Sequence, residues 1–137
     1  PLTPVAVFEG KIATSNMLKG KQTEPDYTGV PSVVFTIPEL ARVGMLEEEA
    51  RETGDVEVSF TDTSGWFSQK RLGETHAGAK IISNSEGKIL GAHMFGPDYA
   101  ELINIFSLAI KLGLTVDQIK TMPAAYPTGA SDIGSML

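Results

Sequence analysis

The sequence predicts an α+β fold, an antiparallel sheet with helices packed on one of its sides. Three observations support this class. The chain has 137 residues, which suits one compact domain, or one domain with a short appendage. Short segments rich in β-branched residues follow one another with turn residues between them, as in a sheet of antiparallel strands. Helical patterns precede and follow these strands, so helices and sheet form separate layers.

The first segment predicts a helix followed by a linker. Thr3 can cap the free N–H groups of a first turn, and Pro4 suits the first helical position. Apolar residues recur at helical spacing as far as Leu18, and Gly20 is a typical stop. Residues 21–29 are polar and contain proline and glycine, so they are the best candidate for a domain boundary.

Four strands are predicted after the linker. Residues 30–37 are rich in β-branched side chains, and nearby prolines limit their pairing. Residues 56–60 alternate between apolar and polar side chains, which is typical of a half-buried strand. Residues 79–83 and 88–95 are two further strands, and the turn residues 84–87 between them predict a hairpin.

Glycines and polar caps mark the remaining helices, which are predicted for residues 46–53, for residues 98–111 and for a short segment from about residue 115. Gly54 and Gly113 stop the first two helices. Thr115 or Asp117 caps the third. The tail contains two prolines and ends in a weak helical turn.

The helix over residues 98–111 has more apolar surface than one sheet can cover. Its apolar side chains occupy an arc of roughly 220°, whereas a helix packed on one sheet shows a stripe of about 100° or somewhat more. Asn104, Ser107 and Lys111 fill the narrow polar remainder. Two interpretations stay open: the helix is sandwiched within its own fold, or it lies under a subunit interface.

Composition narrows the classes of partner. Seventeen acidic residues stand against 11 lysines and arginines, a formal net charge of -6, so we expect no nucleic acid and no membrane surface as partner. No run approaches the roughly 18 apolar residues of a spanning helix. The absence of cysteine excludes disulfides, thiol redox chemistry and cysteine metal sites within this chain. Since the first residue is Pro1 rather than Met, we expect the chain to be cut from a longer protein.

Few residues carry a motif for chemistry. His76 and His93 lie on predicted strands without a ligand or acidic neighbour at suitable spacing, so we expect surface or core histidines and no metal site. Aromatic and basic residues gather in segment 66–71, but the acidic chain favours a core anchor or a lid loop over a nucleotide patch. No glycine motif for dinucleotides or phosphates follows a strand.

The segment YPTGASDI, residues 126–133, predicts a turn that presents one phenol, followed by a helix start. Bonds that precede proline are the only common cis peptide bonds, so Tyr126 and Pro127 fit a tight turn. Thr128 or Gly129 lies near the helix cap.

Four stretches together resemble one family: LTPVAVFEGKIAT, PDYTGVPSVVFTIPELARVGM, KILGAHMFGPDYAELIN and AAYPTGASDI. They are similar to the C-terminal part of the flavin-dependent pyridine nucleotide–disulfide oxidoreductases, which include glutathione reductase, dihydrolipoamide dehydrogenase and mercuric reductase. The resemblance covers nearly the whole chain in the same order. It implies that residues 1–22 are the terminal helix of the family's FAD-binding domain. Residues 26–137 would then be the complete dimerisation, or interface, domain.

The resemblance also implies a function. The chain would be the dimerisation domain of a cytoplasmic oxidoreductase of cell redox homeostasis that uses FAD and NAD(P)H. It would form a symmetric homodimer through the helix over residues 98–111 and the tail, and each tail would complete the partner's flavin site. Alone, the chain would bind no cofactor and catalyse no turnover. Two alternatives stay open: a stand-alone protein-interaction domain without redox role, and a small enzyme that uses Tyr126 and Asp132.

Two sets of site residues follow from the resemblance. In the family, the start of the terminal helix points at the flavin, and the matching residues here are Leu2, Thr3 and Pro4. The positive end of a helix stabilises the negative charge of a reduced flavin. Helix capping alone explains Thr3 and Pro4 equally well.

The second set lies in the tail. The family's His-Pro-Thr-x-x-Glu motif reaches the partner's active site, where its histidine is a general acid and base. Here Tyr126 and Pro127 take the positions of the histidine and proline, and Ser131 that of the glutamate. Asp132 comes one residue late, which turns it by about 100° around a helix. A phenol ionises only near pH 10, so Tyr126 is expected to donate a hydrogen bond rather than shuttle protons.

Overall fold

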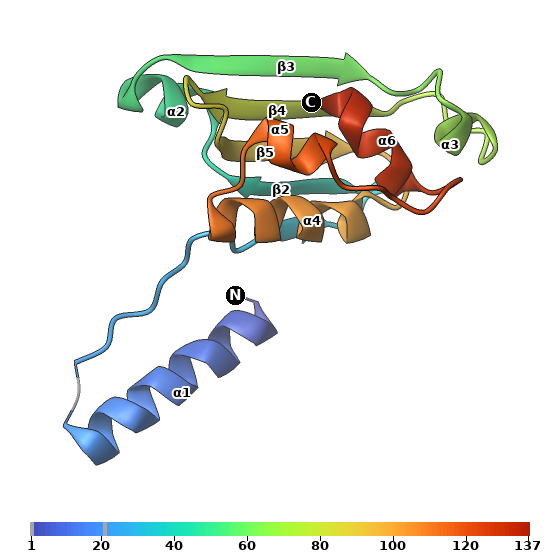
Figure 1. Ribbon diagram of the computed structural model, residues 1–137. Coiled ribbons are helices and arrows are strands. Elements are labelled where there is room, and N and C mark those ends of the chain that lie inside the picture. Colours follow the sequence, from blue (N-terminus) through green and yellow to red (C-terminus); the bar gives the residue numbers. More distant parts are fainter. Residues whose placement is uncertain (1, 21) are drawn as a thin grey trace.

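The computed structural model describes residues 2–20 and 22–137 and contains a five-stranded antiparallel sheet with the order β1-β2-β5-β4-β3 (Figure 1). The strands are β1 (Ser32–Val34), β2 (Leu40–Gly44), β3 (Val56–Asp62), β4 (Gly78–Asn84) and β5 (Ile89–Phe95). The helices are α1 (Thr3–Lys19), α2 (Glu47–Thr53), α3 (Phe67–Lys70), α4 (Tyr99–Leu112), α5 (Val116–Lys120) and α6 (Gly129–Met136). The α+β class with an antiparallel sheet is confirmed.

The first two strands differ from the sequence-based expectation. The predicted strand over residues 30–37 is only three residues long, and the four predicted strands become five because β2 was missed. In β2 only Ala41 and Val43 face the core, so its apolar signal is weak. The strand is fixed by its neighbours, since Ala41 pairs with Met94 of β5 and Val43 with Ala92.

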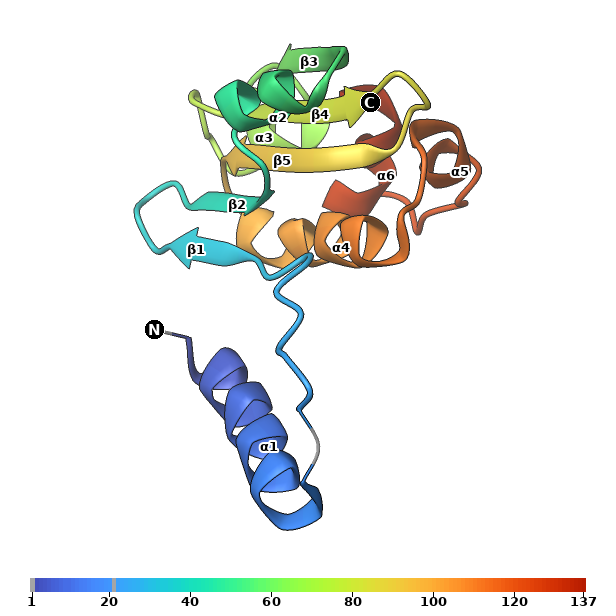
Figure 2. The ribbon, with the colours of Figure 1, turned by 90° about the vertical axis from the view of Figure 1, so that its left-hand side faces the viewer.

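The core lies between one face of the sheet and the helices α4, α5 and α6 (Figure 2). Small and medium side chains of β2, β4 and β5 form its floor, and α4 covers them with Ile103 and Phe106, both fully buried. Ile133 and Met136 attach α6 to the same cluster. The sheet therefore places α4 and the tail side by side.

The first turn of α4 is held by a residue distant in sequence, and its last turn is ended by the glycine that follows it. The carboxylate of Glu39, just before β2, accepts a hydrogen bond of 2.9 Å from the backbone N–H of Ala100. A carboxylate at this end satisfies a free N–H and suits the helix dipole. Gly113 ends the helix with a φ of 65°, as predicted from the sequence.

The helix α2 lies against the opposite face of the sheet, which refines the expectation of helices on one side (Figure 2). Lys80 and Ile82 of β4 alternate with the core residues Ala79 and Ile81, so they point to the other face. Lys80 forms an ion pair of 3.1 Å with Glu47 of α2.

Glu47 also accepts a hydrogen bond from Arg51, and this bond, followed by that from Lys80, holds the pKa of Glu47 below its ordinary value of 4.5. A lowered folded-state pKa contributes stability above the unfolded-state value, and the contribution is lost as the pH falls through the folded-state value. Glu47→Gln should therefore lower the thermal midpoint slightly at pH 7, and the difference should shrink as the pH falls below 4.5 and vanish below the lowered folded-state pKa of Glu47. Thermal unfolding across this pH range, with Glu48→Gln as the control, checks the prediction; an equal loss in both variants would contradict it.

The helix α1 and the linker form an arm that extends from the rest of the chain, and α1 contains no buried residue. In both views α1 lies beyond α4 and β1, at the opposite end of the domain from β3 (Figures 1 and 2). No helix within residues 2–20 and 22–137 is long and apolar enough to cross a membrane.

Candidate functional site

Tyr126 lies in the turn between α5 and α6 and is 83% exposed. Its peptide bond with Pro127 is cis. The Thr128 hydroxyl donates to the carbonyl of Ala125 at 2.5 Å, and Thr128 is the N-cap of α6, as one of the two sequence alternatives predicted. These contacts fix the backbone on both sides of the phenol while its ring extends into solvent.

The tail packs against the connection that carries α3. The Ser68 hydroxyl donates to the carboxylate of Asp132 at 2.5 Å. The side chains at the glutamate position of the motif and at the next residue are both engaged within the chain. Asp132 connects α6 to α3, and the Ser131 hydroxyl donates a hydrogen bond of 2.6 Å to the carbonyl of Thr128. Among the described residues neither side chain hydrogen-bonds Tyr126, so neither acts as the glutamate of the family motif within one chain.

A small cavity of about 210 Å³ lies between α3 and the tail. It is lined by Phe67, Ser68, Arg71, Tyr126, Pro127, Thr128, Ser131 and Asp132. Its volume is below the roughly 300 Å³ at which small-molecule sites begin. A small enzyme built on Tyr126 and Asp132 requires such a cavity, but the carboxylate of Asp132 is already held by Ser68.

The start of α1 differs from the prediction in its capping. Thr3 is the first helical residue, Pro4 the second, and the N-cap is Leu2, whose side chain accepts no hydrogen bond. The expected Thr3 cap is therefore wrong. Among the described residues, no side chain caps the first N–H groups of α1, and the flavin role of residues 2–4 stays a prediction. Among the described residues, no hydrogen bond or ion pair joins this end of α1 to Tyr126 within one chain.

The helix α4 combines both interpretations of its wide apolar arc. Leu102, Ile103, Phe106 and Ala109 are buried in the core of the same chain. On the outer side Leu108 and Leu112 are 58% and 62% exposed, with Ile105 half-buried beside them. We call Ile105, Leu108 and Leu112 the outer stripe of α4. Its residues are spaced three and four apart, so they form one continuous line.

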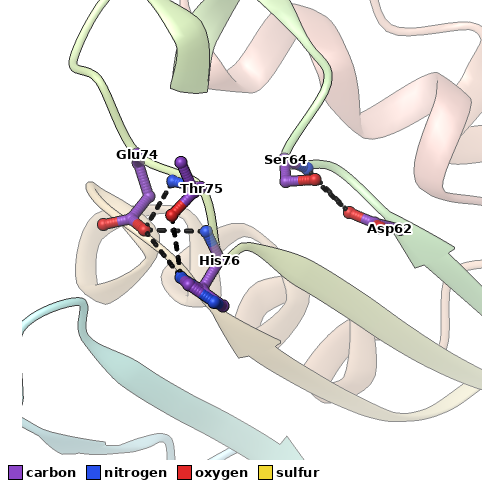
Figure 3. A network of polar contacts seen from close by, with 5 residues as sticks. All are labelled: Asp62, Ser64, Glu74, Thr75 and His76. Atoms are coloured by element: carbon purple, nitrogen blue, oxygen red, sulfur yellow. Dashed lines mark hydrogen bonds and ion pairs between the residues drawn. The ribbon is translucent and has the colours of Figure 1, made fainter.

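His76 and His93 each make polar contacts with their own neighbours. His93 lies on β5, as predicted, and contacts the carbonyl of Met45. The expectation that His76 lies on a strand is wrong, because it comes two residues before β4. Its ring is 3.8 Å from the carboxylate of Glu74 and 2.9 Å from the Thr75 hydroxyl (Figure 3). The acidic neighbour of His76 was missed, because it comes from a loop turn rather than from a strand. The described residues contain no group of three or more histidine or acidic side chains that could hold a metal ion.

The segment over residues 66–71 acts mainly as an anchor. Trp66 packs against the core and Gln69 is buried beneath the loop, where its amide is 3.4 Å from the hydroxyl of Tyr99. Tyr99 in turn shares a 2.7 Å hydrogen bond with the buried Thr63. Burial raises the pKa of Tyr99, so this hydroxyl stays protonated and structural. This network positions α3, and through it Ser68, against the tail.

Comparisons with known proteins agree with this architecture. The family model described as "Pyridine nucleotide-disulphide oxidoreductase, dimerisation domain" matches residues 30–137. A structure of the HOCl-induced flavoprotein disulfide reductase RclA from Escherichia coli, a Cu(II) complex, has a TM-score of 0.87 and 28% identity; the similarity covers 98% of this chain and 31% of that chain.

Two proteins with similar sequences differ in the share of their length that the similarity covers. A protein of Staphylococcus aureus named "Uncharacterized 19.7 kDa protein in mercuric resistance operon" is 44% identical, across 100% of this chain and 77% of its own length. The mercuric reductase of Lysinibacillus sphaericus is 36% identical, across 94% of this chain, and the match spans 24% of that reductase. The chain thus corresponds to about a quarter of the reductase and to most of the small protein.

Proposed function

Since this chain belongs to the dimerisation-domain family of the pyridine nucleotide–disulphide oxidoreductases, we propose that it joins two subunits into a symmetric homodimer. In this proposal the outer stripe of α4 and the tail of one copy pack against those of the other. The observation that carries it is the exposure of two leucines, Leu108 and Leu112, on the side of α4 that faces away from its own core. An apolar line of this kind gains its stabilisation only when a partner removes it from water.

Sedimentation equilibrium of the purified chain tests the homodimer. A mass of twice the 14.6 kDa of one chain at micromolar concentration is the expected result. A monomer throughout the accessible concentration range would contradict the proposal.

The redox part of the proposal concerns subunits in which this chain follows a flavin domain. Residues 1–22 would then be the last helix of that domain and residues 26–137 the interface domain. The first turn of α1, which begins at Leu2, Thr3 and Pro4, would face the flavin with its free backbone N–H groups, and the backbone carbonyl of Tyr126 would reach the flavin of the partner subunit. When bound, FAD would accept hydride from NAD(P)H and pass the electrons on to the acceptor. The chain alone should bind neither cofactor, so its preparation should be colourless near 450 nm; a yellow preparation would contradict this part.

Tyr126 makes the proposal chemically specific. A phenol donates a hydrogen bond to a developing anion but shuttles protons poorly at neutral pH. This favours an electron acceptor that needs no histidine, such as a quinone, a metal ion or another acceptor, over a dithiol–disulfide pair. The similarity to a mercuric reductase supports a metal-ion acceptor.

A chimera in which this chain replaces the matching last quarter of the mercuric reductase tests the role of Tyr126. Tyr126→Phe should lower NAD(P)H-dependent turnover of the preferred acceptor by roughly a hundredfold, as for the loss of one donor to a developing anion. Tyr126→His should instead raise turnover of disulfide substrates, because an imidazole can accept and return protons. Unchanged turnover of both variants with every acceptor would show that the hydroxyl has no catalytic role.

A second candidate function is a protein-interaction module without a flavin domain of its own. The 19.7 kDa Staphylococcus aureus protein favours it, because this chain spans 77% of that protein. The two candidates share the dimer and differ in the redox step. Reading the gene upstream of Pro1 separates them: a dinucleotide-binding glycine motif supports the flavoprotein, and a start codon directly before Pro1 supports the module.

A further inference from the structure

A cavity of about 550 Å³ opens at the end of the sheet where β3 begins and where a turn joins β4 to β5. Its lining comes from the start of β3, the end of β4, the turn over residues 84–87, the helix α5 and Leu137. Figure 2 shows this turn beside α5. All lining residues lie within 55–137, inside the segment that matches the dimerisation domain and apart from α1. The volume is typical of a site for a small molecule.

Hydrogen bonds between segments distant in sequence hold the walls of this cavity in place. The backbone N–H of Val116, the first residue of α5, donates to the carbonyl of Gly87 in the turn at 2.8 Å. On another side, the Ser59 hydroxyl of β3 donates to the carbonyl of Met136 in α6 at 3.3 Å. Walls that are connected in this way keep their shape without a ligand, as is usual for small-molecule sites.

The Ser83 hydroxyl is a buried polar group without a partner in this cavity. Ser83 is only 5% exposed, and among the described residues its hydroxyl forms no hydrogen bond. Ser83 pairs with Ile89, which belongs to the core, so both side chains point to the face of the sheet that the helices cover. The only fully enclosed side-chain polar atom without a partner in the described part of the chain is Oε1 of Gln69, so the Ser83 hydroxyl is reached from the cavity that it lines. A hydroxyl in this position is satisfied only by a polar group that enters the cavity.

Unpaired carboxylates also line the cavity. It has four acidic side chains and one basic side chain, that of Lys120. Three of the acidic residues, Asp55, Glu57 and Asp117, are exposed and form no ion pair within residues 2–20 and 22–137. The fourth, Glu86, already has a lysine partner at 2.8 Å. An excess of unpaired negative charge around a concave site attracts a cation.

The distribution of these carboxylates favours an extended organic cation over a metal ion. In the part of the chain that the structure describes, no three acidic or histidine side chains are close enough to hold a metal ion. The unpaired carboxylates come instead from separate walls, the start of β3 and the helix α5. The lining also contains apolar side chains that lie in the core or pack against it, namely Ile81, Val116 and Leu137. Ammonium groups separated by methylene groups match such a lining, because methylene groups lie on apolar surface while the charged groups reach polar partners.

We propose that this cavity binds a short aliphatic polyamine, a chain of methylene groups that carries two or more ammonium groups. The ammonium groups pair with the carboxylates of Glu57 and Asp117, and one of them donates a hydrogen bond to the Ser83 hydroxyl. The methylene groups lie on the apolar part of the lining. The proposal does not depend on the homodimer, since no residue of the cavity belongs to the outer stripe of α4.

Isothermal titration calorimetry of the full chain with spermidine tests the site. At about 150 mM salt, charges more than about 8 Å away are largely screened, so the measurement reports on the cavity. We expect one spermidine per chain and weaker binding of putrescine, which has one ammonium group fewer. Glu57→Gln/Asp117→Asn should raise the dissociation constant by about tenfold, and Ser83→Ala by about fivefold. Because the Ser83 hydroxyl has no partner in the described part of the chain, Ser83→Ala should leave the thermal midpoint unchanged.

The matched control is Glu48→Gln/Glu52→Gln, which removes the same charge from exposed positions of α2 outside the cavity and should bind spermidine as the wild type does. Equal losses in the two double variants would overturn the proposal, because net charge alone would then attract spermidine. Absence of binding at millimolar spermidine would overturn it as well. Displacement of spermidine by an equal concentration of Mg²⁺ would assign the cavity to a metal ion, and tighter binding of a tetrapeptide of lysine would assign it to a protein segment. The mass of Glu57→Gln/Asp117→Asn in sedimentation equilibrium should equal that of the wild type, so failure of this site leaves the homodimer standing.

Discussion

Leu108→Glu should convert the dimer into a monomer at micromolar concentration. The symmetry of a homodimer repeats every substitution on both sides of the interface, so one change places two carboxylates in the outer stripe. Burial of an unpaired charge costs several kcal/mol, and like charges in one apolar contact add repulsion. We expect the dissociation constant to rise by about a hundredfold or more, which sedimentation equilibrium measures directly.

The fold of the monomer should survive this substitution. Leu108 is 58% exposed and contributes little to the core of its own chain, so the thermal transition of the monomeric variant should remain cooperative. Leu72→Glu changes the charge equally at a residue that follows α3 and is 51% exposed, and it should leave the dimer intact. If Leu108→Glu still sediments as a dimer, the outer stripe is not the interface.

Gly44→Ala should produce the largest loss of stability. Gly44 ends β2 with a φ of 75°, in the left-handed region that side chains rarely adopt. A Cβ there would overlap the backbone carbonyl of Leu90 and would lie 2.8 Å from the Ile110 side chain. Backbone strain and overpacking each cost about 1–3 kcal/mol, so we expect a loss of about 3 kcal/mol or more. The thermal midpoint should fall by about 10 °C.

Gly113 supplies the matched control, because it has a φ of 65° and open space around a Cβ. Gly113→Ala carries the strain without the overlap and should lose only about 1 kcal/mol. Equal losses in the two variants would show that the close contact of β2 with β5 and α4 is not responsible. Chemical denaturation of both proteins gives the two free energies of unfolding for this comparison.

Local patterns predicted the elements whose signals lie within a short stretch of chain. Gly20 and Gly113 end helices as expected, since a left-handed residue after a helix is a local backbone requirement. The hairpin between β4 and β5 and the Thr115 cap of α5 follow from turn and capping residues in the same way. The turn at Tyr126 and Pro127 was also expected from its proline, whereas a functional role of Tyr126 stays a prediction.

The strand β2 shows where local reading fails. Its inner residues, Ala41 and Val43, are small, because α4 passes close above them and leaves no room for larger side chains. The same close packing requires a glycine at position 44. Because the buried residues of the strand are small, the alternation of apolar and polar residues that predicts a strand is weak here. Its identity depends on pairing with β5, some fifty residues later, which no window of the sequence contains.

By itself, the sequence determined the α+β class, the family and the excess of apolar surface on the helix over residues 98–111. Each of these depends on the spacing of apolar residues or on motifs within short segments of the chain. Only the tertiary structure decided how that surface is divided, with Phe106 turned inward and Leu108 outward. It also joined Ser68 to Asp132 and fixed the arm to α4 through Lys111. These contacts link residues 64 and 85 positions apart, and they exist only when sheet and helices bring distant segments within hydrogen-bond distance.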